Sequence, residues 1–140
     1  MLVETLALDA LRSDTVRRVA IANPRVAPYG LAAQQTLEAL GLWETLAPRI
    51  VRGESVAQTY AMIATGNADL GFVALAQVVS ADADGRFVPV PETLYSPIHQ
   101  DVILLARARS NEAAHALREF LLTETAREII LRYGYAVIDP

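Results

Sequence analysis

The apolar residues of this 140-residue chain alternate between short continuous runs and longer stretches with helical spacing. Short β-branched or apolar runs are typical of strands covered on both faces, and they predict strands at 19–22, 50–52 and 70–73. Helical spacing predicts helices at 2–11, 31–40, 42–46, 56–65 and 75–79. This alternation predicts an α/β fold, a three-layer sandwich with a mostly parallel sheet.

The C-terminal third has a different pattern. Apolar runs there predict a peripheral strand at 87–90 and a last strong strand at 101–105. Two helices are predicted to follow, at 112–122 and 124–133, and each has an apolar face that we expect to turn inward.

The stretch from Ala22 to Gly30 joins the first predicted strand to the first long helix. Pro28 suits the first helical position, because its fixed φ fits a helix and the N–H that it lacks has no partner there. The N–H groups of Tyr29 and Gly30 are then expected at the positive end of the helix dipole, where an anion can bind.

A second helix N-terminus follows the second strand. Ser55 and Gln58 have the spacing of a capping box, which predicts that a helix begins at Val56. The Tyr29 and Val56 amides, both following strand ends, could share one tetrahedral oxyanion without any side-chain charge. The alternative is that both are ordinary helix caps, which every helix needs.

Composition narrows the possible functions. The net charge is −4, which argues against a nucleic-acid partner because phosphate binding needs clustered Lys and Arg. The chain has no cysteine, and we find neither a signal peptide at the N-terminus nor an apolar run long enough to span a membrane. Its length fits one domain better than two full lobes with a cleft between them.

Enzymatic motifs are weak. His99 lies near Ser96 and Asp101, but a triad is recognised by geometry, and this spacing across a proline turn does not favour one. His115 is expected to be solvated. The pair Asp82 and Asp84 could ligate a metal but is more typical of a turn around glycine. We therefore predict a protein that is not an enzyme, with no catalytic residue, metal or cofactor.

Six short motifs carry a resemblance to a known family. They are Ala22-Asn23-Pro24, Ala27-Pro28-Tyr29-Gly30, Leu40-Gly41-Leu42-Trp43, Gly53-Glu54-Ser55-Val56, Thr65 through Val73, and Arg132-Tyr133-Gly134-Tyr135. In this order and spacing, the chain resembles the molybdate-binding protein of bacterial ABC transporters. The resemblance implies one lobe of a type II periplasmic-binding-protein fold, a periplasmic location, and delivery of molybdate or tungstate to an ABC permease.

The resemblance also implies roles for particular residues. The backbone amides of Tyr29 and Val56 would bind the oxyanion, and Pro28 and Ser55 would support the two helix N-termini. Some members of the family use a tyrosine hydroxyl just after the third strand, where this chain has Ala74.

The resemblance covers only the C-terminal portion of such proteins. Residues 1–100 would form the second lobe, and 101–140 a strand and helices that in the family return towards a first lobe with no counterpart in this chain. Isolated chains are therefore expected to bind molybdate weakly or not at all. Two alternatives stay open, namely the ligand-sensing domain of a transcriptional regulator and a truncated lobe with little binding activity.

The high apolar content of 53% leads to one further expectation. Helices between Glu112 and Tyr133 that lack their family partner should pack on this lobe, pair in a homodimer, or swap between chains.

Overall fold

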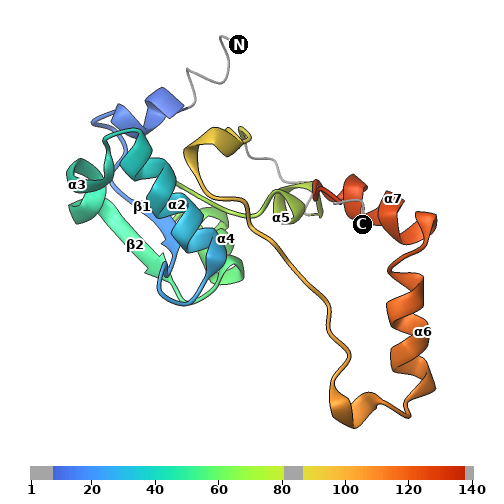
Figure 1. The fold of residues 1–140 in the computed structure, drawn as a ribbon. Helices are drawn as coiled ribbons and strands as arrows, with labels where there is room; N and C mark the ends of the chain where they lie inside the picture. The colour runs from blue at the N-terminus through green and yellow to red at the C-terminus, as the bar shows by residue number, and fades with distance from the viewer. Residues whose placement is uncertain (1–7, 81–86, 138–140) are drawn as a thin grey trace. The chain divides into compact units, whose positions relative to one another are not determined.

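The computed structural model describes residues 8–80 and 87–137 (Figure 1). The chain divides into two compact units, one that ends at Ile98 and one that begins at His99. We call them the sheet unit and the helical unit. The predicted oxyanion site lies wholly in the sheet unit.

Three parallel strands form the sheet, in the order β2-β1-β3. Strand β1 (Val19–Ala22) lies in the centre, and all four of its residues are buried. It pairs along its full length with β2 (Ile50–Gly53) and over two residues with β3 (Leu70–Gly71). The predicted parallel sheet is confirmed, although β3 is shorter than the strand predicted at 70–73.

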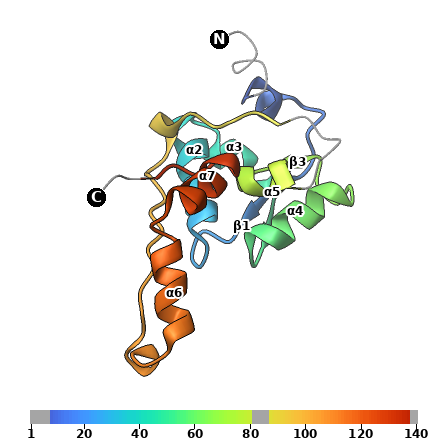
Figure 2. The same ribbon diagram turned by 90° about the vertical axis from the view of Figure 1, so that its right-hand side faces the viewer.

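The helices of the sheet unit lie on both faces of this sheet (Figures 1 and 2). They are α2 (Pro28–Ala39), α3 (Trp43–Leu46), α4 (Val56–Ala64) and α5 (Leu75–Ser80), with short 3-10 turns η1 (Ala10–Arg12), η2 (Ala47–Arg49) and η3 (Glu92–Leu94). Helix α3 ends at Leu46, as predicted, and the 3-10 turn η2 follows it directly through Pro48.

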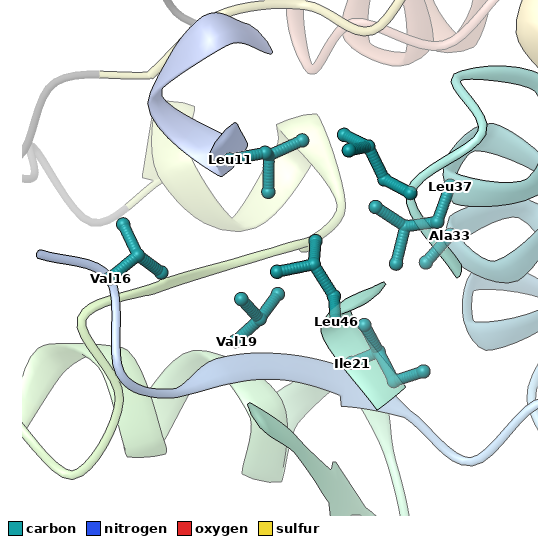
Figure 3. Packing of buried hydrophobic residues seen from close by; sticks show 8 residues of the cluster. Leu11, Val16, Val19, Ile21, Ala33, Leu37 and Leu46 are labelled. Atoms are coloured by element: carbon teal, nitrogen blue, oxygen red, sulfur yellow. The ribbon is translucent and has the colours of Figure 1, made fainter. Parts of the chain in front are cut away.

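Side-chain alternation along β1 divides the sheet unit into its layers. Val19 and Ile21 face the core formed with α2 and α3, as Figure 3 shows around Leu37 and Leu46. Ala20 faces the other side, where a methyl group built on Gly71 would lie 2.9 Å from both the Ala20 Cβ and the Cδ1 of Ile63 in α4. The three-layer α/β sandwich predicted from the sequence is therefore confirmed for this unit.

The core between β1 and α2 is closely packed. Val19, Ile21 and Leu37 are fully buried, and Leu46 is 1% exposed. Burial of each such side chain contributes roughly 1.5–3 kcal/mol relative to exposure. This core fixes α2, and with it the helix N-terminus of interest, on the central strand.

The helical unit contains η4 (Ala106–Ala108), α6 (Glu112–Phe120) and α7 (Glu124–Arg132). Side chains cap both helices, since Asn111 accepts from the Ala114 N–H and Thr123 accepts from the Ala126 N–H. The predicted helices are confirmed, each slightly shorter than expected. No helix in the described parts of the chain is long and apolar enough to span a membrane.

Two predicted strands and one predicted packing face are wrong. Residues 87–90 and 101–105 form no strand. Prolines limit ladder bonds in the first segment, and the second has no strand beside it among the described residues. Leu117 and Phe120, which the sequence predicts to turn inward, are 58% and 44% exposed, because a unit this small covers little of its own apolar surface.

Candidate functional site

The register of the sheet brings the two predicted helix N-termini to one edge. Ala22 at the end of β1 pairs with Gly53 at the end of β2. The chain leaves both strands at this edge, and α2 and α4 begin from the connections that follow (Figure 1). In open parallel sheets, ligands bind at the carboxyl ends of strands.

Helix α2 begins as the sequence predicts, with Ala27 extended at the N-cap and Pro28 in the first turn. Tyr29, half-buried, follows at the second helical position. The prediction for Gly30 is wrong, because its N–H donates to the Ala27 carbonyl oxygen at 2.9 Å. Gly30 instead permits close packing, since a Cβ at this position would lie 2.2 Å from the carbonyl oxygen of Ala22.

Asn23 holds the connection between β1 and α2. Its N–H donates to the Gly53 carbonyl oxygen at 2.8 Å, and its own carbonyl accepts from the Val26 and Ala27 N–H groups at 3.1 and 2.9 Å. Its side-chain oxygen also accepts from the Arg25 N–H at 3.1 Å. These bonds tie the start of α2 to the end of β2.

Helix α4 begins at Val56, and its predicted capping is confirmed. The Ser55 hydroxyl accepts from the Gln58 N–H at 3.2 Å. The Gln58 side-chain oxygen accepts from the Glu54 N–H at 2.7 Å, one residue earlier than in the usual capping box. Val56 occupies the first helical position, where an N–H has no acceptor within the helix.

A buried threonine fixes this helix start on the sheet. Thr59 is fully buried, and its N–H and hydroxyl donate to the Ser55 carbonyl at 3.0 and 2.9 Å. A Cβ on Gly53 would lie 2.8 Å from the Thr59 hydroxyl oxygen. Only glycine therefore allows α4 to begin this close to the end of β2.

Helices α2 and α4 differ from α6 and α7 in the charge of their first turns. Helices α6 and α7 carry Glu112 and Glu124 in their first turns, where a carboxylate complements the positive end of the dipole. Helices α2 and α4 have no acidic residue in the first turn. The two helix N-termini at the sheet edge thus keep a positive dipole end that no carboxylate of their own neutralises.

The residues considered for catalysis or metal binding do not form a site in the described part of the chain. Ser96 is bound to Gln35, through its N–H at 2.9 Å and its hydroxyl at 3.3 Å. The prediction that His115 is solvated is wrong in part. Its side chain is half-buried, and its Nε2 lies 2.9 Å from the Arg109 carbonyl oxygen. Asp82 and Asp84 lie outside the described residues, and no group of three potential metal ligands occurs within them.

Sequence reasoning missed three residues that shape this edge. Asn23 carries a turn signal, since an Asn-Pro pair follows the strand directly. Thr59 and Gln77 have no local signal, because their partners lie on other elements or in the preceding loop. Ala74, where some family members have a tyrosine, is buried, and its N–H donates to the Gln77 side-chain oxygen at 3.1 Å.

Residues 4–136 match the family described as bacterial extracellular solute-binding protein. The chain belongs to this family. The match extends over both units.

Several relatives of this solute-binding protein are molybdate-binding proteins. It is 46% identical over 125 residues to the molybdate-binding protein ModA of Rhodobacter capsulatus, covering 89% of this chain and 49% of that protein. It is 44% identical over 132 residues to ModA of Azotobacter vinelandii, covering 91% and 51%. The resemblance identified in the sequence is confirmed, and the chain spans about half the length of the curated relatives it matches.

A solved structure agrees with these similarities. The periplasmic molybdate-binding protein of Azotobacter vinelandii superposes with a TM-score of 0.83 at 37% identity, covering 92% of this chain and 58% of that one. The predicted periplasmic-binding-protein fold is therefore confirmed.

Proposed function

We propose that this chain binds molybdate or tungstate through the backbone amides of Tyr29 and Val56, as part of the substrate-binding component of an ABC importer. The oxyanion would sit at the sheet edge where β1 and β2 end, between the N-termini of α2 and α4. In the cell it would act in the periplasm and deliver its ligand to a membrane permease. The similarity to molybdate-binding proteins supports the choice of ligand.

One observation supports the site more than any other. The two helices that start at this edge lack an acidic first-turn residue, whereas α6 and α7 have one. A free anion can take the place that a glutamate takes at α6 and α7. The register pairs Ala22 with Gly53, so the connections that lead to the two helix N-termini leave the sheet side by side, which supports a shared ligand.

The net charge of −4 is compatible with this function. Amide dipoles act at contact distance, whereas charges elsewhere on the surface are screened over roughly 8–10 Å at ordinary ionic strength. Water competes for these donors when the site is open to solvent. We therefore expect the isolated 140-residue chain to bind molybdate more weakly than about 1 μM, which corresponds to roughly −8 kcal/mol.

A titration followed by amide NMR tests the site directly, because it detects weak binding. Adding molybdate at constant ionic strength should shift the Tyr29 and Val56 amide resonances in a saturable way. Tungstate should do the same, and sulfate should shift them less. Saturable shifts confined to other residues would refute this location, and a submicromolar dissociation constant would refute the expectation of weak binding.

A single substitution can remove one proposed donor and keep the helix. Val56→Pro deletes the N–H at a first helical position, where proline is favoured. Ser55 is extended, with φ −145° and ψ 163°, as a residue before proline requires. Loss of one donor worth about 1 kcal/mol should weaken binding about fivefold.

Val56→Ala is the matched comparison for this substitution. It shortens the same side chain but keeps the N–H, so its molybdate affinity should stay within about twofold of the parent, an energy change below roughly 0.5 kcal/mol. Equal affinities of the proline and alanine variants would exclude the Val56 amide as a ligand.

A further inference from the structure

One glutamine side chain connects two helix N-termini of the sheet unit. Gln77, half-buried, lies in the first turn of α5. Its side-chain oxygen accepts from the Ala74 N–H at 3.1 Å, and its side-chain nitrogen donates to the Val56 carbonyl oxygen at 3.2 Å. The side chain therefore spans from Ala74, the residue before α5, to the first residue of α4.

The bond to Ala74 fixes the glutamine in place. The Gln77 N–H also donates to the Ala74 carbonyl at 3.0 Å, so backbone and side chain both hold the residue that precedes α5. This is the reach of a glutamine at the third helical position back to the N-cap, as in a capping box. Because the Gln77 side-chain oxygen is held by this bond, the side-chain nitrogen points in a defined direction.

The bond to Val56 acts on the proposed ligand residue. The peptide group before Val56 is held through the Ser55 carbonyl, which accepts from Thr59. The peptide group after it is held through the Val56 carbonyl, which accepts from Gln77. Since φ and ψ of Val56 are the torsions between these two peptide groups, the two bonds together restrict the orientation of the peptide that carries the Val56 N–H.

We infer that Gln77 is a positioning residue, which directs the Val56 N–H towards the oxyanion by fixing the first turn of α4 against α5. The part of this inference that concerns oxyanion binding rests on the proposed function. Its geometric part concerns the direction of one N–H bond, and can be measured without any ligand. Because β2 and β3 flank β1, this contact links the connections that follow the two outer strands.

Two substitutions separate the two bonds of Gln77. Gln77→Met keeps a similar length and removes both. Gln77→Glu keeps an acceptor for the Ala74 N–H, and its negative charge suits the start of α5, but it cannot donate to the Val56 carbonyl. Gln34→Met is the control, because the Gln34 side chain donates along α2 to the Glu38 carboxylate at 2.7 Å and lies on a different helix from Val56.

The ligand-free measurement is the residual dipolar coupling and the 15N order parameter of the Val56 N–H, compared with those of Ala20 and Ile21 in the sheet. Both Gln77 variants should change the Val56 coupling and lower its order parameter, with the strand values unchanged. Gln34→Met should leave all of them as in the parent. An unaltered Val56 coupling in Gln77→Met would overturn the inference.

Molybdate titration of the same samples gives the second readout. Gln77→Met should raise the dissociation constant about fivefold, the value for one hydrogen bond of about 1 kcal/mol. A lowered unfolding midpoint with unchanged affinity and unchanged Val56 coupling would show a structural role only, and would overturn the inference. If molybdate shifts the amide resonance of neither Tyr29 nor Val56 in the parent chain, the proposed function is wrong. The residual dipolar coupling of the Val56 N–H, measured without ligand, then decides the role of Gln77.

Discussion

The sheet unit and the helical unit differ in how well their apolar residues are covered. In the sheet unit, Val19, Ile21 and Leu37 are fully buried on the central strand and its neighbouring helix. In the helical unit, Val102, Ile103 and Leu122 are 70%, 81% and 82% exposed. The same kind of sequence pattern thus produces a closed core in one unit and an uncovered apolar surface in the other.

The difference follows from the number of elements available for packing. The sheet unit has three strands with helices on both faces, so each apolar side chain meets another layer. The helical unit has two α-helices and an extended segment within its described residues, and a unit of this size leaves much apolar surface in water. Tertiary packing therefore stabilises the sheet unit more than the helical unit.

The largest expected effect comes from a matched pair of leucines. Leu37→Ala in α2 removes a fully buried side chain, so it should lower the free energy of unfolding by about 3 kcal/mol. Leu117→Ala in α6 removes one that is 58% exposed and should cost less than about 0.5 kcal/mol. Urea unfolding followed by fluorescence of Trp43, the single tryptophan, reports the core of the sheet unit.

Far-UV circular dichroism on the same samples covers the helical unit as well. Both substitutions replace leucine by alanine inside a helix, so helix propensity changes equally in the two variants. Equal destabilisation by the two substitutions would contradict the contrast between the units.

A smaller effect is expected on self-association. The exposed apolar residues between Glu112 and Tyr133 should pair copies of the chain, as the sequence predicts for this region. Leu117→Lys keeps a good helix former and should weaken association about tenfold, because burying one leucine contributes roughly 1.5 kcal/mol or more. Light scattering over a range of concentrations measures this.

Val26→Lys is the control for association. Val26 is 65% exposed in the sheet unit, so a lysine there adds the same charge outside the helical unit. It should leave association unchanged. A parent chain that is monomeric at every concentration would rule out the homodimer and the swapped oligomer.

The contrast between the units also explains what could be predicted from the sequence. The start of α2 at Pro28 and the capping of α4 by Ser55 depend on a few neighbouring residues, and these signals were sufficient. The end of α2 is equally local, since Gly41 has a φ of +67° and the Leu42 N–H donates to the Leu37 carbonyl at 2.8 Å.

Features that depend on distant partners could not be predicted in this way. The apolar run at 101–105 has the composition of a strand, but a strand also needs a neighbour for its backbone, and composition says nothing about that. The bond of Gln77 to Val56 likewise exists only once α4 and α5 lie side by side. The oxyanion role of Tyr29 and Val56 stays a prediction that the titration will decide.

The smallest expected effect concerns a carboxylate that holds the amino-terminal edge of the sheet. One Asp69 oxygen accepts from the Arg17 and Arg18 N–H groups at 2.8 and 2.9 Å, and the Asp69 N–H donates to the Arg18 carbonyl at 3.0 Å. These hydrogen bonds, that of Arg18 first, lower the pKa of Asp69 below its ordinary value of 3.8.

Because the pKa is lower in the folded chain, the unfolded chain binds the proton more readily, and stability rises with pH through this range. The contribution of Asp69 is fully present above about pH 4, the ordinary carboxyl pKa, and is lost as pH falls through the folded value. Asp69→Asn should therefore lower the urea midpoint of the Trp43 transition at pH 7, with a difference from the parent that shrinks below about pH 4.

Asp14→Asn is the control for this titration, because Asp14 is fully exposed and its ion pair to Arg49 is 3.8 Å long. An exposed pair at this distance contributes little, so the pH dependence of this variant should follow that of the parent. A constant difference between Asp69→Asn and the parent from pH 7 to pH 3 would show that the carboxylate charge is not what holds β1 and β3 together at this edge.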